Sequence, residues 1–336
     1  MAVVISNSNL NRAFKKLFIK GLPLGISAIF LLLLPPFLPN HIQGIIVKFL
    51  IYALFAISYD LVFGYTGLVS LGHAAFFGVG GYVVAVLSLH WANNLFWLGM
   101  PLAIILASVV AAIYGLIALR VSGTYFLLLT FALAQLLYSF SWNVRWFNSS
   151  GMQGIANISM PFLGFHIEWN NLSYYYFTFI LFAVCFFVLT RIVSSPFGHA
   201  LVGIRENELR MEALGYNVWL FKYLSFVLGG AFASVSGVLF AYFNRFISPA
   251  QFSLGTSFLP MVIVIIGGRG TLYGALIGAA VVVFAEYFIS LLTPERWPLI
   301  LGCIFVLSIM YFREGIGVYL MQLWKKVTKT NGSASY

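Results

Sequence analysis

Three ionisable residues, Asp60, His73 and Glu286, fall within long apolar stretches of the sequence. A charge is expensive to keep in such surroundings, so groups of this kind can relay a proton or an ion, or contact a polar substrate. They can equally form hydrogen bonds between helices and so fix their packing. No repeated acidic pattern accompanies the three residues, which favours the packing role. Glu286, expected deepest in its apolar run, is the strongest candidate for a functional role.

The residue patterns that support catalysis are missing from the sequence. It has no Gly-x-x-x-x-Gly-Lys-[Ser/Thr] loop to cradle a phosphate, no His-Glu-x-x-His pair and no cysteine cluster with metal-ligand spacing. The two cysteines, Cys185 and Cys303, lie in apolar runs and are expected to be packing residues. An enzyme built on His73 or His199 would lack the accompanying groups. We therefore expect no enzymatic activity, no cofactor and no metal site.

Two glycine clusters lie at the ends of apolar runs, one in each half of the chain. The first contains Gly64 and Gly67, and the second contains Gly267, Gly268, Gly270 and Gly274. Such dense glycine is costly inside a helix, so 267–270 is predicted to be a tight turn. Glycine elsewhere lets helices approach closely. Related interruptions in two halves are typical of transporters built from repeats, which suggests that the clusters lie along a translocation path or at its packing contacts.

The segment 191–219 is polar and holds three of the eight acidic residues of the chain. Glu206 and Arg210 stand four residues apart in the favourable order for a helical pair, and Gly215 is a natural helix end. Interspersed apolar residues give the segment a partial apolar face. We predict one or two short helices at the membrane surface, which could dock a soluble partner; an ordinary solvated connector is the alternative.

The amino-acid composition indicates the kind of structural element that holds these residues. Of 336 residues, 62% are hydrophobic and only 8% are charged, whereas soluble domains carry about 25% charged residues. Such a chain could not hide its apolar surface in water. Runs near the roughly 20 residues that cross a bilayer predict ten spans, at 21–39, 45–63, 72–90, 99–119, 122–142, 174–190, 220–243, 257–268, 271–292 and 298–312. We therefore predict an all-α polytopic membrane protein, in which the glycine-rich third span and the short eighth are candidates for broken or re-entrant helices.

The basic residues orient the predicted spans. With the N-terminus inside, 14 of the 18 Lys and Arg residues fall in cytoplasmic segments, and the outer four are Lys48, Arg145, Arg245 and Arg296. This asymmetry supports an even number of spans with both ends in the cytoplasm. It divides the chain into a cytoplasmic segment 1–20, a membrane domain 21–312 with an outer loop 143–173 and an inner loop 191–219, and a cytoplasmic tail 313–336. We attribute the net charge of +10 to the basic residues that orient the spans in the membrane, so no nucleic-acid partner is expected.

Four stretches of the chain resemble, in family order, the permease subunits of branched-chain amino acid ABC importers of the LivM type. They are GYTGLVSLGHAAFFGVGGY (64–82), LRVSGTYFLLLTFALAQ (119–135), FGHALVGIRENELRMEALGYNVWLFK (197–222) and GGRGTLYGALIGA (267–279). The resemblance covers roughly 45–312. It implies a type II-like ABC importer permease fold in the cell inner membrane, a second permease subunit, two cytoplasmic ATPase subunits that hydrolyse ATP, and an extracytoplasmic substrate-binding protein.

The resemblance also implies a cytoplasmic coupling helix. That role passes to the matching stretch, with Arg205, Glu206, Asn207 and Glu208 at its centre and His199, Arg210, Glu212 and Gly215 beside them. Residues expected along the translocation path or at its packing contacts are Gly64, Gly67, His73, Gly267, Gly268, Gly270, Gly274 and Glu286. ATP binding would close the ATPase dimer, and the resulting force would reach the spans through the coupling helix.

Two alternatives stay open at this stage. Closely similar permeases serve urea and short amides, and the outer stretch 150–155 departs from the family pattern, which leaves the substrate undecided. An ion-coupled secondary transporter acting alone would instead use Asp60 and Glu286 as coupling sites. The sequence also leaves open which binding protein delivers the substrate, and whether the partner permease is a second copy or a different chain.

Overall fold

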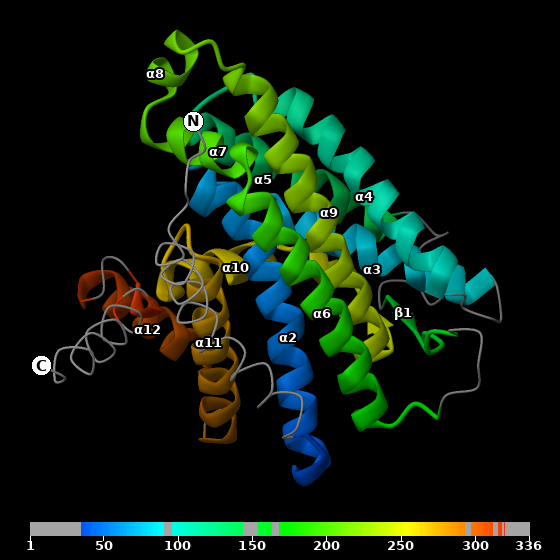
Figure 1. The fold of residues 1–336 in the computed structure, drawn as a ribbon. Coiled ribbons are helices and arrows are strands. Elements are labelled where there is room, and N and C mark those ends of the chain that lie inside the picture. The colour runs from blue at the N-terminus through cyan, green and yellow to red at the C-terminus, as the bar shows by residue number, and fades with distance from the viewer. Residues whose placement is uncertain are drawn as a thin grey trace, which may run out of the picture.

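The computed structural model describes residues 35–90, 96–143, 154–162, 168–292, 297–311, 315–317 and 319. These residues are almost entirely helical (Figure 1). The helices are α2 (Asn40–Asp60), α3 (His73–His90), α4 (Phe96–Ala118), α5 (Thr124–Asn143), α6 (Asn171–Ser194), α7 (Pro196–Glu206), α8 (Glu208–Ala213), α9 (Val218–Asn244), α10 (Leu254–Gly267), α11 (Leu272–Leu292) and α12 (Trp297–Tyr311). A π-helical turn, Leu61–Tyr65, extends α2. Two-residue strands β1 (Ile155–Ala156) and β2 (Phe246–Ile247) pair antiparallel.

The chain is an all-α polytopic membrane protein, and each predicted span from 45–63 onward coincides with a helix. Within the described residues, 6 helical segments are long and apolar enough to cross a membrane. They are α2 with its π-helical turn, α4, α5, α6, α9 and α11. The helices α3 and α10 are apolar but shorter. The first predicted span, 21–39, lies almost wholly outside the described residues, so the count of about ten spans stays a prediction.

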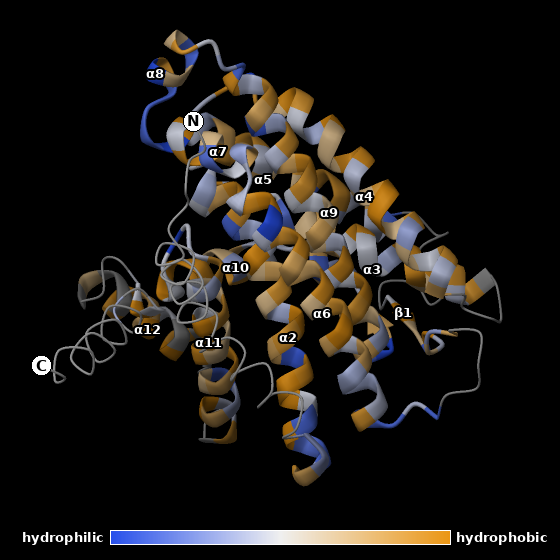
Figure 2. Cartoon of the chain, viewed as in Figure 1, coloured by the Kyte–Doolittle hydropathy of each residue, from blue (hydrophilic) through white to orange (hydrophobic). Residues whose placement is uncertain are grey.

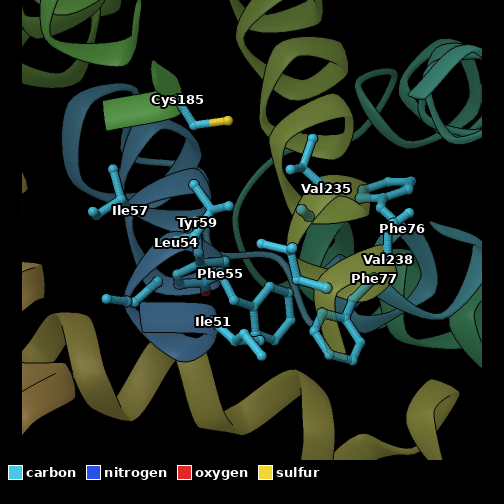
Figure 3. Packing of buried hydrophobic residues seen from close by; sticks show 14 of the residues in the cluster. Ile51, Leu54, Phe55, Ile57, Tyr59, Phe76, Phe77, Cys185, Val235 and Val238 are labelled. Carbon is cyan, nitrogen blue, oxygen red and sulfur yellow. The ribbon is translucent and has the colours of Figure 1, made fainter. Parts of the chain in front are cut away.

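The core of the molecule forms around α2, which packs against α6, α9, α10 and α11. Figure 3 shows its aromatic centre, where Phe55 and Tyr59 of α2 lie close to Phe77 of α3 and Val238 of α9. The rings of Phe55 and Phe77 are 4.7 Å apart. Cys185 of α6 is a buried free cysteine, as expected of a packing residue. Burial of large apolar side chains on every face of α2 explains why this span is hydrophobic all round.

The peripheral helices separate a close-packed face from an exposed apolar face. In α4 the buried residues Ala103, Ala107 and Ala111 recur at four-residue spacing. This small-residue stripe lets α9 approach, and a Cβ on Gly230 of α9 would come within 2.7 Å of the Ala111 Cβ. The other side of α4 exposes Ile105 and Val109. Figure 2 shows orange, hydrophobic residues along these outer helices, as a lipid-facing surface requires.

The third and eighth predicted spans each coincide with one continuous, shorter helix, and irregular backbone precedes each of them. The helix α3 begins only at His73, after the non-helical segment 66–72, and α10 begins at Leu254, after a 3₁₀ turn at Pro249–Phe252. Protein covers part of the backbone before each helix, because Leu71 and Phe252 are buried, whereas Gly67 is exposed. The Leu71 N–H donates to the Thr130 hydroxyl at 3.2 Å. Irregular backbone of this kind is tolerated at membrane depth only where protein or a water-filled cavity surrounds it.

The two ends of the helical bundle differ in charge. At one end, the turn after α2, the α4–α5 connection, α8 and the start of α9 surround a common hollow, and the α10–α11 turn contacts the end of α2. This end carries Arg120, Arg205, Arg210, Lys222 and Arg269. The strands β1 and β2 lie towards the opposite end (Figure 1). The described parts of the inner loop 191–219 and of the α4–α5 and α10–α11 connections therefore lie at one basic end.

Candidate functional site

Arg205, in the last turn of α7, is an exposed residue whose guanidinium reaches the end of α2. Its guanidinium donates a hydrogen bond to the carbonyl of Gly64, in the π-helical turn that ends α2. The side chain also lies against Gly67, where an added Cβ would stand 3.1 Å from the Arg205 Cγ. At Gly270, an added Cβ would stand 2.6 Å from the Arg205 Nη1. One arginine of the predicted coupling segment therefore contacts both predicted glycine clusters.

Asp60 completes this arrangement from the opposite side. Its side chain is 0% exposed, and its Oδ1 accepts a hydrogen bond from the Gly270 N–H at 2.8 Å. A Cβ on Gly64 would stand 1.8 Å from that same oxygen and 2.3 Å from the Gly270 nitrogen. Only glycine fits at position 64. We call Asp60, Gly64, Arg205 and Gly270 the glycine junction.

The turn between α10 and α11 is held by close backbone approaches. The Thr271 hydroxyl donates to the Gly268 carbonyl at 2.8 Å, and Gly268 adopts a φ of 110° that side chains rarely allow. A Cβ on Gly267 would stand 1.9 Å from the Gly274 carbonyl oxygen. Gly268 and Gly270 thus lie in a tight turn beside the glycine junction, and Gly267 at the end of α10 packs against Gly274 at the start of α11.

Two glycines of the predicted C-terminal tail also contact this turn, which the sequence did not indicate. A Cβ on Gly315 would stand 2.2 Å from the Gly268 Cα, and one on Gly317 would stand 2.4 Å from the Gly267 carbonyl oxygen. Residues 315–317 are therefore packed against the membrane domain rather than free of it. A short Gly-Ile-Gly motif beyond the last apolar run was the available signal.

His73 lies in the aromatic core and is not part of the glycine junction. Its Nε2 is 3.0 Å from the Ser58 hydroxyl. Its ring stacks on Phe55 at 5.6 Å and meets the edge of Tyr59 at 5.2 Å. This enclosure corresponds to the packing role that the sequence favoured for buried ionisable groups.

Glu286 is likewise distant from the glycine junction. It lies in the second half of α11, and its Oε1 is 2.8 Å from the Nζ of Lys48 in the first half of α2. Lys48, counted with the outer loops by its charge, is a residue of a helix. The two side chains are 35% and 21% exposed, Lys48 being the more exposed. Glu286 thus forms an interhelical ion pair away from the basic end of the bundle.

The coupling segment forms two helices of different exposure. In α7, Leu201 and Ile204 are buried against the membrane domain. In α8 no residue is buried, and Leu209 and Leu214 are 78% and 67% exposed. Figure 1 shows α8 projecting from one end of the molecule beyond α7. The helix α7 therefore holds the segment against the membrane domain, and α8 is its exposed part.

The break between α7 and α8 corrects one prediction. Asn207 has an extended backbone, with a φ of −160°, and its side chain accepts from the Arg210 N–H at 2.9 Å to cap α8. Glu206 therefore ends one helix and Arg210 belongs to the next, so the pair predicted from a single helix does not form. The capping asparagine prevails because it supplies an acceptor to the free N–H groups of the new helix.

Other residues of the coupling segment have local partners. Glu208 pairs with Lys222 of α9 at 2.5 Å, which ties α8 to the bundle. Gly215 adopts a φ of 85°, and the bonds from Gly215 to Glu212 and from Tyr216 to Met211 close the helix as expected. The exposed ring of His199 stays within its own helix region, with its Nδ1 2.8 Å from the Ser195 carbonyl.

A hollow of about 890 Å³ lies beside α8 at the basic end. Its walls come from the segment after α2, the α4–α5 connection and the start of α9. Its lining contains both basic and acidic side chains, namely Arg120, Lys222, Glu208 and Glu212. The stretches 64–82, 119–135 and 197–222, which are far apart in the sequence, therefore border one space.

The structure places the predicted site residues in several separate regions. Gly64, Arg205 and Gly270 belong to the glycine junction, Gly67 lies against Arg205, Gly267 and Gly268 lie at the adjoining turn, and Gly274 is at the start of α11, whereas His73 and Glu286 lie in two other places. Glu208, Arg210, Glu212 and Gly215 belong to the exposed α8 region. The sequence missed the bond between Asp60 and Gly270, because no local spacing relates residues 210 positions apart. It also missed Leu209, although a leucine in a charged segment was a usable signal.

Comparisons with known proteins show which family the chain is similar to. Residues 41–309 match the family model described as branched-chain amino acid transport system / permease component. The high-affinity branched-chain amino acid transport system permease protein LivM of Escherichia coli is 26% identical over 291 residues, covering 80% of this chain and 68% of the relative. A probable branched-chain amino acid transport permease protein LivM of Methanocaldococcus jannaschii is 25% identical, covering 74% and 81%. No solved structure matches the chain at a significant level.

The similarity extends to a second kind of permease protein. The high-affinity branched-chain amino acid transport system permease protein LivH of Escherichia coli is 26% identical over 288 residues, covering 79% of this chain and 90% of the relative. The family match includes α2 to α11, and with them the glycine junction and the coupling segment. The chain therefore belongs to the branched-chain amino acid transport system permease component family.

Proposed function

We propose that this chain is a permease subunit of an ATP-driven importer that carries branched-chain amino acids across the inner membrane. It works with a second permease subunit, two cytoplasmic ATPase subunits that hydrolyse ATP, and an extracytoplasmic binding protein. The observation that carries the proposal is the Arg205–Gly64 contact, which joins the presented α7–α8 segment to the membrane helices. A chain without a nucleotide-binding loop needs such a connection, because energy released in another subunit must bias its conformation.

In this proposal α8 docks on an ATPase subunit. Exposed Leu209 of α8 and Leu214, which directly follows α8, form the apolar centre of the contact, and Arg210 and Glu212 form its polar rim, as is usual in protein interfaces. Buried Leu201 and Ile204 hold α7 against the bundle, so that a movement of α8 reaches the membrane helices. Glu206, Asn207 and Gly215 set the direction and length of α8, and His199 supports α7.

The wider architecture belongs to the same proposal. The chain has about ten spans with a type II-like fold, and both termini lie in the cytoplasm. Substrate passes between two permease subunits along small and apolar residues, which suits a weakly held apolar amino acid. Selective recognition is left to the binding protein outside, which explains the scarcity of charged residues in the spans.

The described contacts give no support to an ion-coupled transporter acting alone. Asp60 accepts a hydrogen bond from the Gly270 backbone, and Glu286 is paired with Lys48. Both carboxylates therefore have structural partners, whereas a coupling site must bind and release an ion. No described contact favours the urea or short-amide alternative either.

Uptake by the assembled complex tests the proposal. The chain is reconstituted with its partner permease, ATPase subunits and binding protein in vesicles, and labelled leucine uptake is measured with and without ATP on the ATPase side. We expect ATP-dependent uptake that excess isoleucine or valine suppresses and excess urea or acetamide does not. Suppression by the amide alone would favour the alternative substrate class, and ATP-independent uptake would refute the proposal.

A further inference from the structure

A small hollow lies at the end of the bundle opposite to the basic end. Its volume is about 220 Å³, and it lies where α2 and α6 begin and where α9 ends. The strand β2, which follows α9, is paired with β1 at this end (Figure 1). The sequence assigns this end to the outside of the membrane, since Arg245 is counted among the outer basic residues. We call this space the outer hollow.

One wall of the outer hollow is aromatic. Trp169, Tyr174 and Phe243 line it. The rings of Tyr174 and Phe243 are stacked with their centroids 5.9 Å apart, and the rings of Trp169 and Tyr174 meet edge to face at 6.1 Å. The Tyr174 hydroxyl donates to the Leu239 carbonyl at 2.6 Å, so its ring is the part that a ligand can contact. A wall of this kind suits an apolar group.

Of the described residues that line the outer hollow, Arg245 alone is charged. Its backbone is fixed by a φ of 50°, which is uncommon for a residue with a side chain, and by a hydrogen bond from the Ile158 N–H to its carbonyl at 3.2 Å. Its side chain is exposed and forms no ion pair with the described residues. The guanidinium is therefore available to a carboxylate, which it can bind through two parallel hydrogen bonds.

The outer hollow has the size and the polar groups for a small metabolite. Its volume of about 220 Å³ is below the ~300–1,000 Å³ of pockets for drug-sized ligands. Asn170 and Asn171 border it, and the side-chain carbonyl of an asparagine accepts hydrogen bonds from an ammonium group. Asn171 is oriented by its Nδ2, which donates to the Asn40 carbonyl at 3.3 Å. The arginine, the asparagines and the aromatic wall match in turn the carboxylate, the ammonium group and the side chain of an apolar amino acid.

We propose that the outer hollow is an entry site, which holds a branched-chain amino acid before it passes between the permease subunits. Arg245 binds the carboxylate, Asn170 and Asn171 accept from the ammonium group, and the aromatic wall contacts the side chain. The inference rests on the proposed function and adds to it a ligand site on this chain. The site holds its ligand weakly, because its guanidinium is exposed to water, so tight selection stays with the binding protein.

Direct binding of labelled leucine tests the entry site. The complex of this chain with its partner permease and ATPase subunits is placed in nanodiscs, and equilibrium binding is measured with the binding protein left out. The variants are Arg245→Met and Gly44→Val. Gly44 lines the outer hollow, and a Cβ there would meet the Phe243 ring at an ordinary contact distance of 3.7 Å, so a small side chain fits and narrows the space.

Arg191→Met is the matched control. Arg191 is also an exposed arginine, but it lies in the last turn of α6, at the other end of that helix from the outer hollow. Its guanidinium lies over the Phe187 ring of its own helix, 4.9 Å from the ring centroid. The control therefore removes the same charge and leaves the entry site intact.

We expect saturable leucine binding by the wild-type complex, weakened about fivefold by Arg245→Met and unchanged by Arg191→Met. Gly44→Val weakens it as well, because less space is left for the ligand. Isocaproate, which keeps the carboxylate of leucine and lacks the ammonium group, competes, whereas isoamylamine, which lacks the carboxylate, does not. Absence of saturable wild-type binding, or equal binding by wild type and Arg245→Met, would overturn the inference. If Arg245→Met does not accumulate, Gly44→Val decides by the same criterion.

Two other outcomes are distinguished by adding the binding protein. If Arg245→Met lowers retention of the binding protein and leaves direct leucine binding at the wild-type level, Arg245 is a contact for that protein and the inference is refuted. If the wild-type complex with all its subunits takes up leucine without ATP or not at all, the proposed function itself fails. Failure of the entry site alone leaves wild-type uptake dependent on ATP.

Discussion

At the scale of single residues, Gly64 carries the strictest steric requirement of the glycine junction. We expect Gly64→Ala to lower the free energy of unfolding by about 3 kcal/mol, because the new methyl group overlaps Asp60 and the Gly270 backbone. Denaturation of the purified chain in mixed micelles measures the loss. Gly302→Ala in α12 is the control, since nothing lies within 4 Å of the added Cβ. Equal stability of the two variants would show that the junction is looser than described.

Asp60 is the acceptor of the Gly270 N–H, and this role needs an oxygen but no charge. We expect Asp60→Ala to cost about 1–3 kcal/mol of stability by leaving that N–H unsatisfied. Asp60→Asn keeps the oxygen and is expected to lose less. Unfolding midpoints of the two variants give the comparison. If Asp60→Asn is as unstable as Asp60→Ala, the charge of the carboxylate matters beyond the bond to Gly270.

The Lys48–Glu286 pair joins α2 to α11 across an apolar setting. Removing one partner leaves the other charge unpaired, so we expect Glu286→Gln or Lys48→Met alone to destabilise the chain more than both together. A double-mutant cycle on unfolding, with uptake measured in parallel, checks this. Near-wild-type uptake by the double variant is the expected result, and loss of uptake in a stably folded double variant would restore Glu286 as a functional site.

At the scale of elements, α8 is the surface that the proposal assigns to the ATPase subunit. We expect Leu209→Ala with Leu214→Ala to lower retention of the ATPase subunits about tenfold, because interface energy concentrates in a few buried apolar anchors. Quantitative co-purification measures it. Leu136→Ala, which shortens another exposed leucine on α5, is the matched control. Retention that stays equal in both variants would place docking elsewhere on the chain.

The elements were predictable where a single run of residues determines them. Long apolar stretches predict α4, α6 and α9 to within a few residues, since length and hydropathy suffice to mark a span. Two short helices were within the prediction for this segment, but the place of the break was not, because the capping side chain of Asn207 competes with the continuous helix suggested by Glu206 and Arg210. The sequence raised broken or re-entrant helices for the third and eighth spans, whereas α3 and α10 are each one continuous helix.

The sequence indicated the residues of the candidate site, but it did not indicate that they contact one another. The sequence singled out Arg205 and both glycine clusters, and it also drew attention to Asp60. Their meeting depends on contacts between residues 141 and 210 positions apart, for which sequence periodicity carries no signal. From the sequence alone, His73 and Glu286 looked equivalent to the residues of the glycine junction. In the structure, each of them has a separate set of partners.

At the scale of the whole molecule, Arg120, Arg205, Arg210, Lys222 and Arg269 gather with the coupling segment at one end, and the paired strands lie towards the other. In the proposed importer, the basic end faces the ATPase subunits, and the opposite end faces the binding protein that delivers the substrate. The glycine junction lies at the basic end, where the ends of α2, α7 and α10 converge. The chain then serves as a conduit whose movement is powered by other subunits.

The most direct test of this dependence uses the complete complex with ATPase subunits that bind ATP but cannot hydrolyse it. Leucine uptake into vesicles is compared with that of the active complex, with and without an imposed ion gradient. We predict that multiple-turnover uptake disappears and that no ion gradient restores it. Sustained uptake by the inactive complex, driven by an ion gradient or by none, would contradict the account of this chain as a permease that draws its energy from partner ATPases.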